Sequence, residues 1–237
     1  MSLNGLILKK RTAPLNLYDF KLIAFDMDST LINIECIDEI ASVAGLKDEV
    51  SYITELTMRG EIKDFKESLR RRVELLKGTH DSALEEVYNN KLQLNPGAEK
   101  LLTTCRGAGL KSLLVSGGFT YFAERVKALL RIDFSRSNEL EIKDGYLTGG
   151  LIKQAWGDIC DGEEKKRMLI QTCSDNNIEL HQAIAVGDGS NDIPMMLECT
   201  NAGGLSVAYH AKPIVKEHAL LCIEEGGLDR MLEVFSY

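Results

Sequence analysis

Residues 22–32 read Leu-Ile-Ala-Phe-Asp-Met-Asp-Ser-Thr-Leu-Ile. The first four residues, Leu22–Phe25, form an apolar run with the length of a buried strand, and Asp26 and Asp28 follow at once. A continuous apolar run is typical of a parallel strand that is covered on both faces. Two carboxylates this close disfavour joint ionisation, so a nearby cation is implied. The stretch therefore predicts a functional loop at the carboxyl end of a buried strand.

More apolar runs of strand length follow along the chain, each with small or acidic residues after it: Leu113–Val115, Ala183–Val186 and Leu205–Ala208. Longer stretches with helical periodicity separate them. This alternation predicts an α/β fold, with a Rossmann-like parallel sheet covered by helices on both faces. Because ligands of such sheets bind beyond the carboxyl ends of the strands, functional residues are expected directly after each run. Asp144-Gly145, within residues 133–152, is typical of a hairpin turn.

Residues 34–90 have a different pattern, with apolar residues at helical spacing and no convincing strand. Helices are expected there at about 37–44, 65–76 and 82–89. Gly45 and Gly78 follow the first two of these segments, where a helix C-cap glycine belongs. We therefore predict a discontinuous catalytic core of residues 1–33 and 91–237, with a small α-helical cap domain of residues 34–90 inserted after the first strand.

The composition excludes several classes of protein. The 237 residues include 28 basic and 36 acidic side chains, a formal net charge of −8. Nucleic-acid binding depends on clustered Lys and Arg, so no nucleic-acid partner is expected. No stretch approaches the ~18 apolar residues that span a membrane, so no membrane partner is expected either. The 6 cysteines form no C-x-x-C pair, which favours reduced thiols and a cytoplasmic protein. The oligomeric state has no signature in the sequence.

Three further polar groups follow the later apolar runs. Ser116-Gly117-Gly118 offers a hydroxyl and backbone amides to an anion. Lys165 and Lys166 lie on a predicted helix that opens after Asp161-Gly162, and the segment 187–192, Gly-Asp-Gly-Ser-Asn-Asp, adds two carboxylates. Neither a P-loop nor a complete dinucleotide-binding fingerprint is present. Acidic, hydroxyl and lysine side chains are thus expected together at one edge of a sheet. This combination favours a functional site over a set of solvated turns.

In this order, D-x-D-S-T, V-S-G-G-F, a lysine on a following helix and G-D-G-x-N-D resemble the motifs of the haloacid dehalogenase-like (HAD) hydrolases. Glu35-Cys-Ile-Asp-Glu-Ile-Ala and Ser68-Leu-Arg-Arg-Arg72-Val resemble, more narrowly, the phosphoserine phosphatase family. The resemblance covers roughly residues 20–235. It implies an Mg²⁺-dependent phosphomonoesterase that hydrolyses O-phospho-L-serine to L-serine and phosphate, the last step of serine biosynthesis.

The resemblance also implies a role for each core motif. Asp26 would be the nucleophile that forms an aspartyl-phosphate. Asp28 would protonate the departing serine oxygen and then take a proton from water. Asp26, the Asp28 carbonyl and Asp188 would hold Mg²⁺, which prefers oxygen ligands. The residues that would bind the phosphate are Ser116, Gly117 and Asn191.

The catalytic lysine has two candidates. Adjacent residues on a helix point about 100° apart, so only one of Lys165 and Lys166 can face the site. Matching Asp161 to the family residue before this helix favours Lys165, which would neutralise the charge of the phosphate and the nucleophile. Asp192 would orient that lysine or a metal-bound water.

Substrate choice is expected to depend on the cap. Phosphoserine carries an ammonium group, which suits Glu35, and a carboxylate, which Arg72 can bind in a bidentate manner. Met58 and Phe65 match apolar family positions in the same pocket, and the alternative for both is packing in the core of the cap.

Two other functions stay open. A related phosphatase acting on another small phosphate, such as phosphohomoserine, would use the same core. A phospho-accepting signalling module also uses clustered acids and a lysine, but it needs neither an acid at Asp28 nor a cap of this size.

Overall fold

The computed structural model describes residues 2–58, 61–62 and 64–237, without the side chains of residues 2, 3, 57 and 58. Within that part the main sheet has the strand order β1-β2-β10-β9-β8-β4-β5-β6-β7. Its strands are β1 Ser2–Leu3, β2 Leu6–Leu8, β4 Leu22–Phe25, β5 Lys111–Phe119, β6 Phe134–Lys143, β7 Tyr146–Ile152, β8 Ala183–Gly187, β9 Leu205–Tyr209 and β10 Leu221–Ile223. A separate parallel pair joins β3 Leu15–Asn16 to β11 Phe235–Ser236.

The four predicted apolar runs form β4, β5, β8 and β9, which lie side by side in the order β9-β8-β4-β5. All three of these pairings are parallel, so the carboxyl ends of the four strands share one edge. Successive residues of a strand point to opposite faces. Leu22 and Ala24 of β4 accordingly join one apolar cluster, and Ile23 and Phe25 join the other. The sheet is therefore buried on both sides, as predicted.

Helices supply the apolar partners of both faces. Side chains of α5 (Ala98–Gly107) and α6 (Thr120–Leu130) share the cluster of Ile23. Side chains of α7 (Gly162–Asp175), α8 (Ile193–Asn201) and α9 (Pro213–His218) share the cluster of Leu22. This arrangement confirms the α/β fold expected from the sequence.

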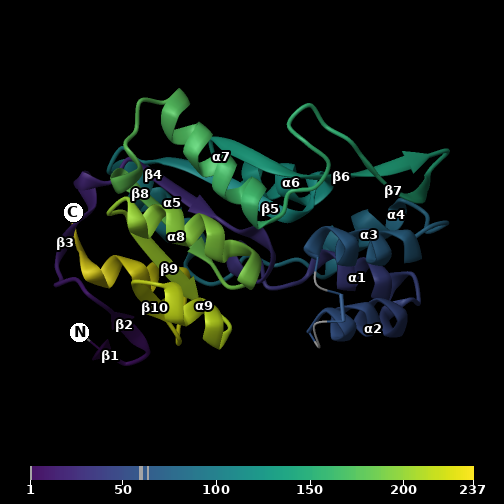
Figure 1. The fold of residues 1–237 in the computed structure, drawn as a ribbon, viewed down its shortest axis with the longest axis horizontal. Coiled ribbons are helices and arrows are strands. Elements are labelled where there is room, and N and C mark those ends of the chain that lie inside the picture. The colour runs from purple at the N-terminus through teal and green to yellow at the C-terminus, as the bar shows by residue number, and fades with distance from the viewer. Residues whose placement is uncertain (1, 59–60, 63) are drawn as a thin grey trace.

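The first four α-helices after β4 gather at one end of the molecule, beside the β6–β7 hairpin (Figure 1). They are α1 Cys36–Val43, α2 Lys47–Met58, α3 Phe65–Leu75 and α4 Ser82–Asn90, and we call them the helical insert. Gly149 of β7 comes so close to α3 that a Cβ at this glycine would lie 3.1 Å from the Cβ of Lys77 and 3.2 Å from the Glu74 carbonyl oxygen. The hairpin and the insert are thus packed together, and the division into a core and a cap domain stays a prediction.

The hairpin turn is the one predicted from the sequence. Asp144 and Gly145, with φ of 51° and 82°, join β6 to β7. The first residues of the chain were not predicted as strands, yet β2 pairs antiparallel with β10. Among the described residues, none of the helices is long and apolar enough to cross a membrane.

Candidate active site

The loop after β4 holds the first two acidic residues. The loop forms a wide turn over Met27–Leu31, and Asp26 is the N-cap residue before it. The Oδ1 atom of Asp26 accepts a hydrogen bond of 2.7 Å from the backbone N–H of Met27. Ser29 sits at a φ of 57°, a left-handed conformation that is uncommon outside glycine. Its hydroxyl donates to Glu35 Oε1 over 2.7 Å. The turn therefore links the strand end directly to the start of the helical insert.

Lys165 lies between two carboxylates beneath the site. Its Nζ is 2.7 Å from Asp26 Oδ1 and 2.7 Å from Asp192 Oδ1, and its side chain is 0% exposed. Burial acts to lower the pKa of Lys165, but the Asp192 and Asp26 carboxylates outweigh it and raise that pKa above the ordinary lysine value. Lys166 instead points outward, with Nζ 3.7 Å from Glu198. Of the two candidates, Lys165 is the one that reaches the site.

The loop after β8 supplies Asp188 and Asp192. Asp192 Oδ2 accepts hydrogen bonds from the backbone N–H groups of Asp188 and Gly189, at 3.1 and 3.0 Å. A Cβ at Gly187 would lie 2.4 Å from Asp192 Cγ, so only glycine fits at this strand end. Burial, with the neighbouring Asp192 carboxylate, raises the pKa of Asp188 to about 7. Both carboxylate oxygens of Asp192 already accept hydrogen bonds within the protein, whereas the Asp188 carboxylate can still bind a ligand.

Oxygen atoms of Asp26, Asp188 and Asp192 lie within 4.8 Å of one another. Burial and the Asp192 carboxylate raise the pKa of Asp26 well above its ordinary value. One lysine cannot balance three carboxylates, two of them buried and that of Asp188 half-buried, and hard divalent cations prefer this kind of ligand. The donor set therefore fits a divalent metal held chiefly by Asp26 and Asp188.

The Asp28 carboxyl group is not part of this cluster, and it faces the insert. Its Oδ1 accepts a hydrogen bond of 3.3 Å from the backbone N–H of Cys36. Burial and the nearby Glu35 raise the pKa of Asp28 to about 7. A carboxyl group that titrates near neutral pH can both donate and accept a proton, as a general acid and base must. Metal binding by the Asp28 carbonyl stays a prediction.

Ser116, Gly117 and Gly118 form the end of β5. The backbone N–H of Gly118 donates to Ser116 Oγ over 2.8 Å. A Cβ at Gly118 would lie 2.5 Å from Asp28 Oδ2, and one at Gly117 would lie 2.9 Å from Cζ of Phe65. A side chain at either position would therefore displace a neighbouring side chain of the site. Ser116 is wholly buried and Gly117 lines the cavity described next, and their role in phosphate binding stays a prediction.

A cavity of about 660 Å³ opens between the sheet edge and the insert. The predicted site residues that line it are Asp26, Asp28, Glu35, Phe65, Arg72, Gly117, Asp188 and Asn191. Arg72 donates through Nε to the Ser68 carbonyl at 3.4 Å. Among the described residues, no carboxylate lies within 4.0 Å of its guanidinium nitrogens. The side chain of Met58 lies outside the described part, so its predicted contact is untested.

Residues that the sequence reasoning missed also line this cavity, among them Asp38, Lys212 and Ile214. Lys212 follows β9, the last of the four predicted strands, so the rule of searching strand ends could have found it. Asp38 lies on α1 beside the better recognised Glu35, and only the fold shows that it faces the cavity. Its Oδ1 is buried without a hydrogen-bond partner among the described residues.

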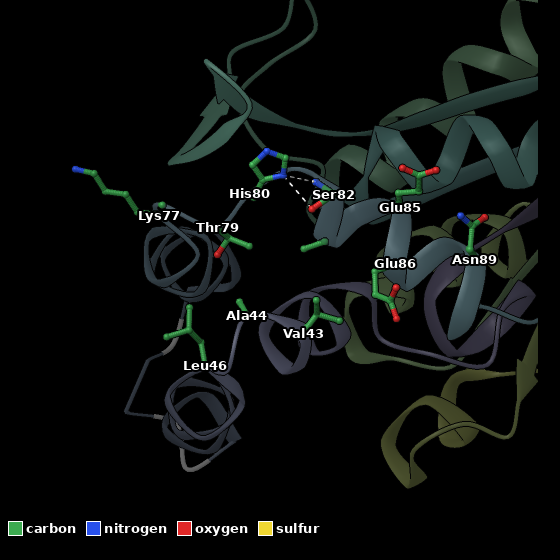
Figure 2. A pocket seen from close by; sticks show the side chains of 12 residues that line it. Val43, Ala44, Leu46, Lys77, Thr79, His80, Ser82, Glu85, Glu86 and Asn89 are labelled. Atoms are coloured by element: carbon green, nitrogen blue, oxygen red, sulfur yellow. Dashed lines mark hydrogen bonds between the residues drawn. The ribbon is translucent and has the colours of Figure 1, made fainter.

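A larger cavity, of about 750 Å³, lies elsewhere, between α1, α4 and the segment 77–80 (Figure 2). His80 Nδ1 accepts a hydrogen bond from the backbone N–H of Ser82 at 3.2 Å, and Lys77 points away from the opening in Figure 2. No cluster of metal-ligating side chains lines it within the described residues. The chemistry is therefore concentrated in the smaller cavity.

Comparison with known proteins agrees with this geometry. The family model of haloacid dehalogenase-like hydrolases matches residues 23–197. A phosphoserine phosphatase from Polaromonas sp. strain JS666 is 61% identical, over 97% of this chain and 96% of its own length. The chain is a haloacid dehalogenase-like hydrolase of the phosphoserine phosphatase family.

Other members of the phosphoserine phosphatase family are similar over most of the chain. The Haemophilus influenzae protein is 46% identical, covering 91% of this chain and 65% of that protein. Two solved structures, a phospho-aspartyl intermediate analogue and a substrate-bound complex of phosphoserine phosphatase, each have a TM-score of 0.81 and 38% identity. Each match covers 92% of this chain and 99% of the solved chain.

Proposed function

We propose that this HAD hydrolase releases L-serine and phosphate from O-phospho-L-serine, through an aspartyl-phosphate on Asp26, as the last step of serine biosynthesis. One observation carries the proposal: a single cavity joins the buried acids of the sheet edge to an anionic and a cationic side chain of the insert, Glu35 and Arg72. These two groups match the ammonium and carboxylate of a phosphorylated amino acid.

The nucleophile is poised by its neighbours. Met27 and Lys165 both donate to Asp26 Oδ1, which leaves Oδ2 as the oxygen that can attack phosphorus in line. The raised pKa of Lys165 keeps its proton in place at neutral pH. Its positive charge stabilises the negative charge that builds up as the P–O bond to serine breaks.

Asp28 completes the proton transfers. With a pKa of about 7 it is in part protonated at neutral pH, so it can give its proton to the departing serine oxygen. The resulting carboxylate then takes a proton from the water that attacks the aspartyl-phosphate. Attack on phosphorus restores the Asp26 carboxylate and releases phosphate.

The proposed cofactor is Mg²⁺, held by Asp26, Asp188 and the Asp28 carbonyl. It would neutralise the carboxylates and polarise the phosphoryl group. Asp192 acts beside it by fixing Lys165. We also propose that the insert is a cap domain that closes over a small-molecule substrate. The six buried free thiols support a reducing compartment, the cytoplasm.

A substrate panel tests the proposal. Purified protein with Mg²⁺ is expected to release phosphate from O-phosphoserine with a kcat/KM at least about a hundredfold above that for sugar and nucleotide phosphates, since two charged contacts distinguish the substrates. A flat profile would remove the substrate assignment. A preference for phosphohomoserine would move it to the near alternative, and stable phosphorylation without turnover would favour a signalling module.

A further inference from the structure

The pairing of β5 with β6 slips at the end of β5 that faces the cavity. Val115 pairs with Arg136 and Phe119 pairs with Asn138, so residues 116–118 face Ser137 alone. An irregularity of this kind leaves backbone groups without their ladder partners. The Gly117 carbonyl lies in this irregular stretch, where a partly buried carbonyl still needs a hydrogen-bond donor.

The side chain of Asn138 supplies that donor. Its Nδ2 donates to the Gly117 carbonyl oxygen over 2.7 Å. Its Oδ1 accepts from the backbone N–H of Cys160, also over 2.7 Å. Asn138 is 1% exposed, so water does not compete for either contact. One amide therefore joins the end of β5 to the segment that precedes α7.

Both segments carry groups that the proposed reaction uses. The peptide that links Gly117 to Gly118 is held at both ends, its carbonyl by Asn138 and its N–H by Ser116 Oγ at 2.8 Å. Since Ser116 Oγ accepts the hydrogen bond from that N–H, the hydrogen of the Ser116 hydroxyl stays available to another acceptor. On the other side, Cys160 directly precedes Asp161, the N-cap of the helix that bears Lys165.

We propose that Asn138 is a positioning residue of the active site, which sets the phosphate-binding turn 116–118 at a fixed distance from the start of the lysine-bearing helix. The proposal rests on the phosphoryl transfer proposed above. Only a side chain with a donor and an acceptor at one planar end can make both contacts. The substitution Asn138→Asp would keep the acceptor and lose the donor, and Asn138→Ala would lose both.

The test measures Asn138→Asp with O-phosphoserine and with p-nitrophenyl phosphate, with rates divided by the folded fraction from circular dichroism. We expect kcat to fall at least about tenfold on both substrates, since small misplacements of reacting groups are costly. The inhibition constant of inorganic phosphate should rise, whereas KM for phosphoserine should change less than kcat because Glu35 and Arg72 are untouched. p-Nitrophenyl phosphate reports on transfer even if phosphoserine proves not to be the substrate.

Thr120→Val is the matched control. Thr120 Oγ1 donates to the backbone carbonyl of Asn138 over 2.9 Å and lies 3.2 Å from Ser137 Oγ, so this variant removes hydrogen bonds at the same place without touching Gly117. It should lower the melting temperature and leave kcat near that of the parent. Asn138→Asp with parental kcat and phosphate inhibition, or losses that match those of Thr120→Val at equal stability, would overturn the proposal. If Asn138→Asp does not fold, Asn138→Ala is judged by the same criteria.

Discussion

Lys165 and Lys166 show how much one position matters at the scale of the residue. Both are lysines on α7, yet one is buried between Asp26 and Asp192 and the other stays near the surface. Because adjacent residues on a helix point about 100° apart, only one of the two lysines could face the site. The helix begins after its N-cap residue Asp161, and this start places Lys165 toward the site. The motif therefore singled out the lysine that the fold places between Asp26 and Asp192.

The acidic site should bind a metal with release of protons. The pKa values of Asp28 and Asp188 are raised from 3.8 to about 7, chiefly by burial. Between these pH values the metal-free folded protein holds more protons than the unfolded chain, so its free energy of unfolding should fall as the pH rises from 4 to 7. Mg²⁺ bound by Asp188 would displace the proton of that carboxyl group, and titration calorimetry at pH 6 in two buffers of different ionisation enthalpy should detect its release.

At a pH well above 7 these carboxyl groups have already lost their protons, so the same titration should show almost no release. Chelation of the metal at that pH should lower the stability most, because the carboxylates then repel one another without compensation. Proton release that is equal at pH 6 and above pH 8 would contradict the raised pKa values.

Arg72→Ala should separate substrate recognition from phosphoryl transfer. Removing its guanidinium should lower kcat/KM for phosphoserine about a hundredfold, as for other bidentate charged contacts, and should change that for p-nitrophenyl phosphate little. Arg71→Ala is the control, because Arg71 is exposed and pairs with Glu67 on the same helix. Steady-state kinetics on both substrates measure the difference. Equal losses on the two substrates would make Arg72 a structural residue.

At the scale of the element, ion pairs join the insert to the segment before α7, beside the cavity. On α3, Lys66 Nζ lies 3.1 Å from Asp158 Oδ1, and Arg70 contacts the same carboxylate. Asp158 belongs to the segment before α7, so these pairs cross from the insert to the loop that leads to Lys165. They are partly exposed, and such pairs are worth about 0.2–1 kcal/mol and are screened by salt.

Asp158→Asn should therefore weaken closure of the insert modestly. We expect KM for phosphoserine to rise up to about fivefold at low ionic strength, and the difference from the parent to vanish near 1 M salt, where screening removes the pair in both proteins. Glu67→Gln, which breaks a pair within α3, is the control and should leave KM unchanged. A salt-independent effect would mean that Asp158 acts through its backbone contacts.

Some elements could be predicted and others could not, for physical reasons. The buried runs of β4, β5, β8 and β9 are recognisable because both faces of each strand are apolar. In contrast α2, Lys47–Met58, was missed because its sequence is mostly polar and Val50 is its one fully buried apolar residue among those described. Strands β2 and β10 are short, and their pairings in the sheet identify them: β2 pairs with β1 and β10, and β10 pairs also with β9.

At the scale of the whole molecule, the acid, lysine and phosphate motifs were predictable because each follows its own strand or opens its own helix. Whether these motifs lie close together depends on the order of the strands in the sheet, which no single motif specifies. The contributions of Asp38 and Asn138 were not predictable, because each depends on a neighbour brought close by the fold. The local sequence motifs indicated the type of reaction, and the contacts made by the fold determine which other residues lie beside the motif residues.

Gly97→Ala should lower global stability without changing the reaction. Gly97, where the chain returns from the insert, has a φ of 80°, and a Cβ there would lie 2.5 Å from the backbone nitrogen of Asp229. We expect the free energy of unfolding to fall by about 2–4 kcal/mol, with unchanged kcat per folded molecule. Urea unfolding measures this. Gly107→Ala in α5, with nothing within 4 Å of the new Cβ, should be neutral or slightly stabilising.

The central position of β4 has a consequence for the synthesis of the protein in the cell. β4 ends at Phe25, but its partners β5 and β8 begin only at Lys111 and Ala183. At roughly 5–20 residues added per second, one edge of this apolar strand waits on the order of 10–30 s for β8 to leave the ribosome. An unpaired apolar edge invites association with other nascent chains. The yield of active enzyme should therefore depend on how well chaperones shield a strand that is made early and whose last partner is made more than 150 residues later.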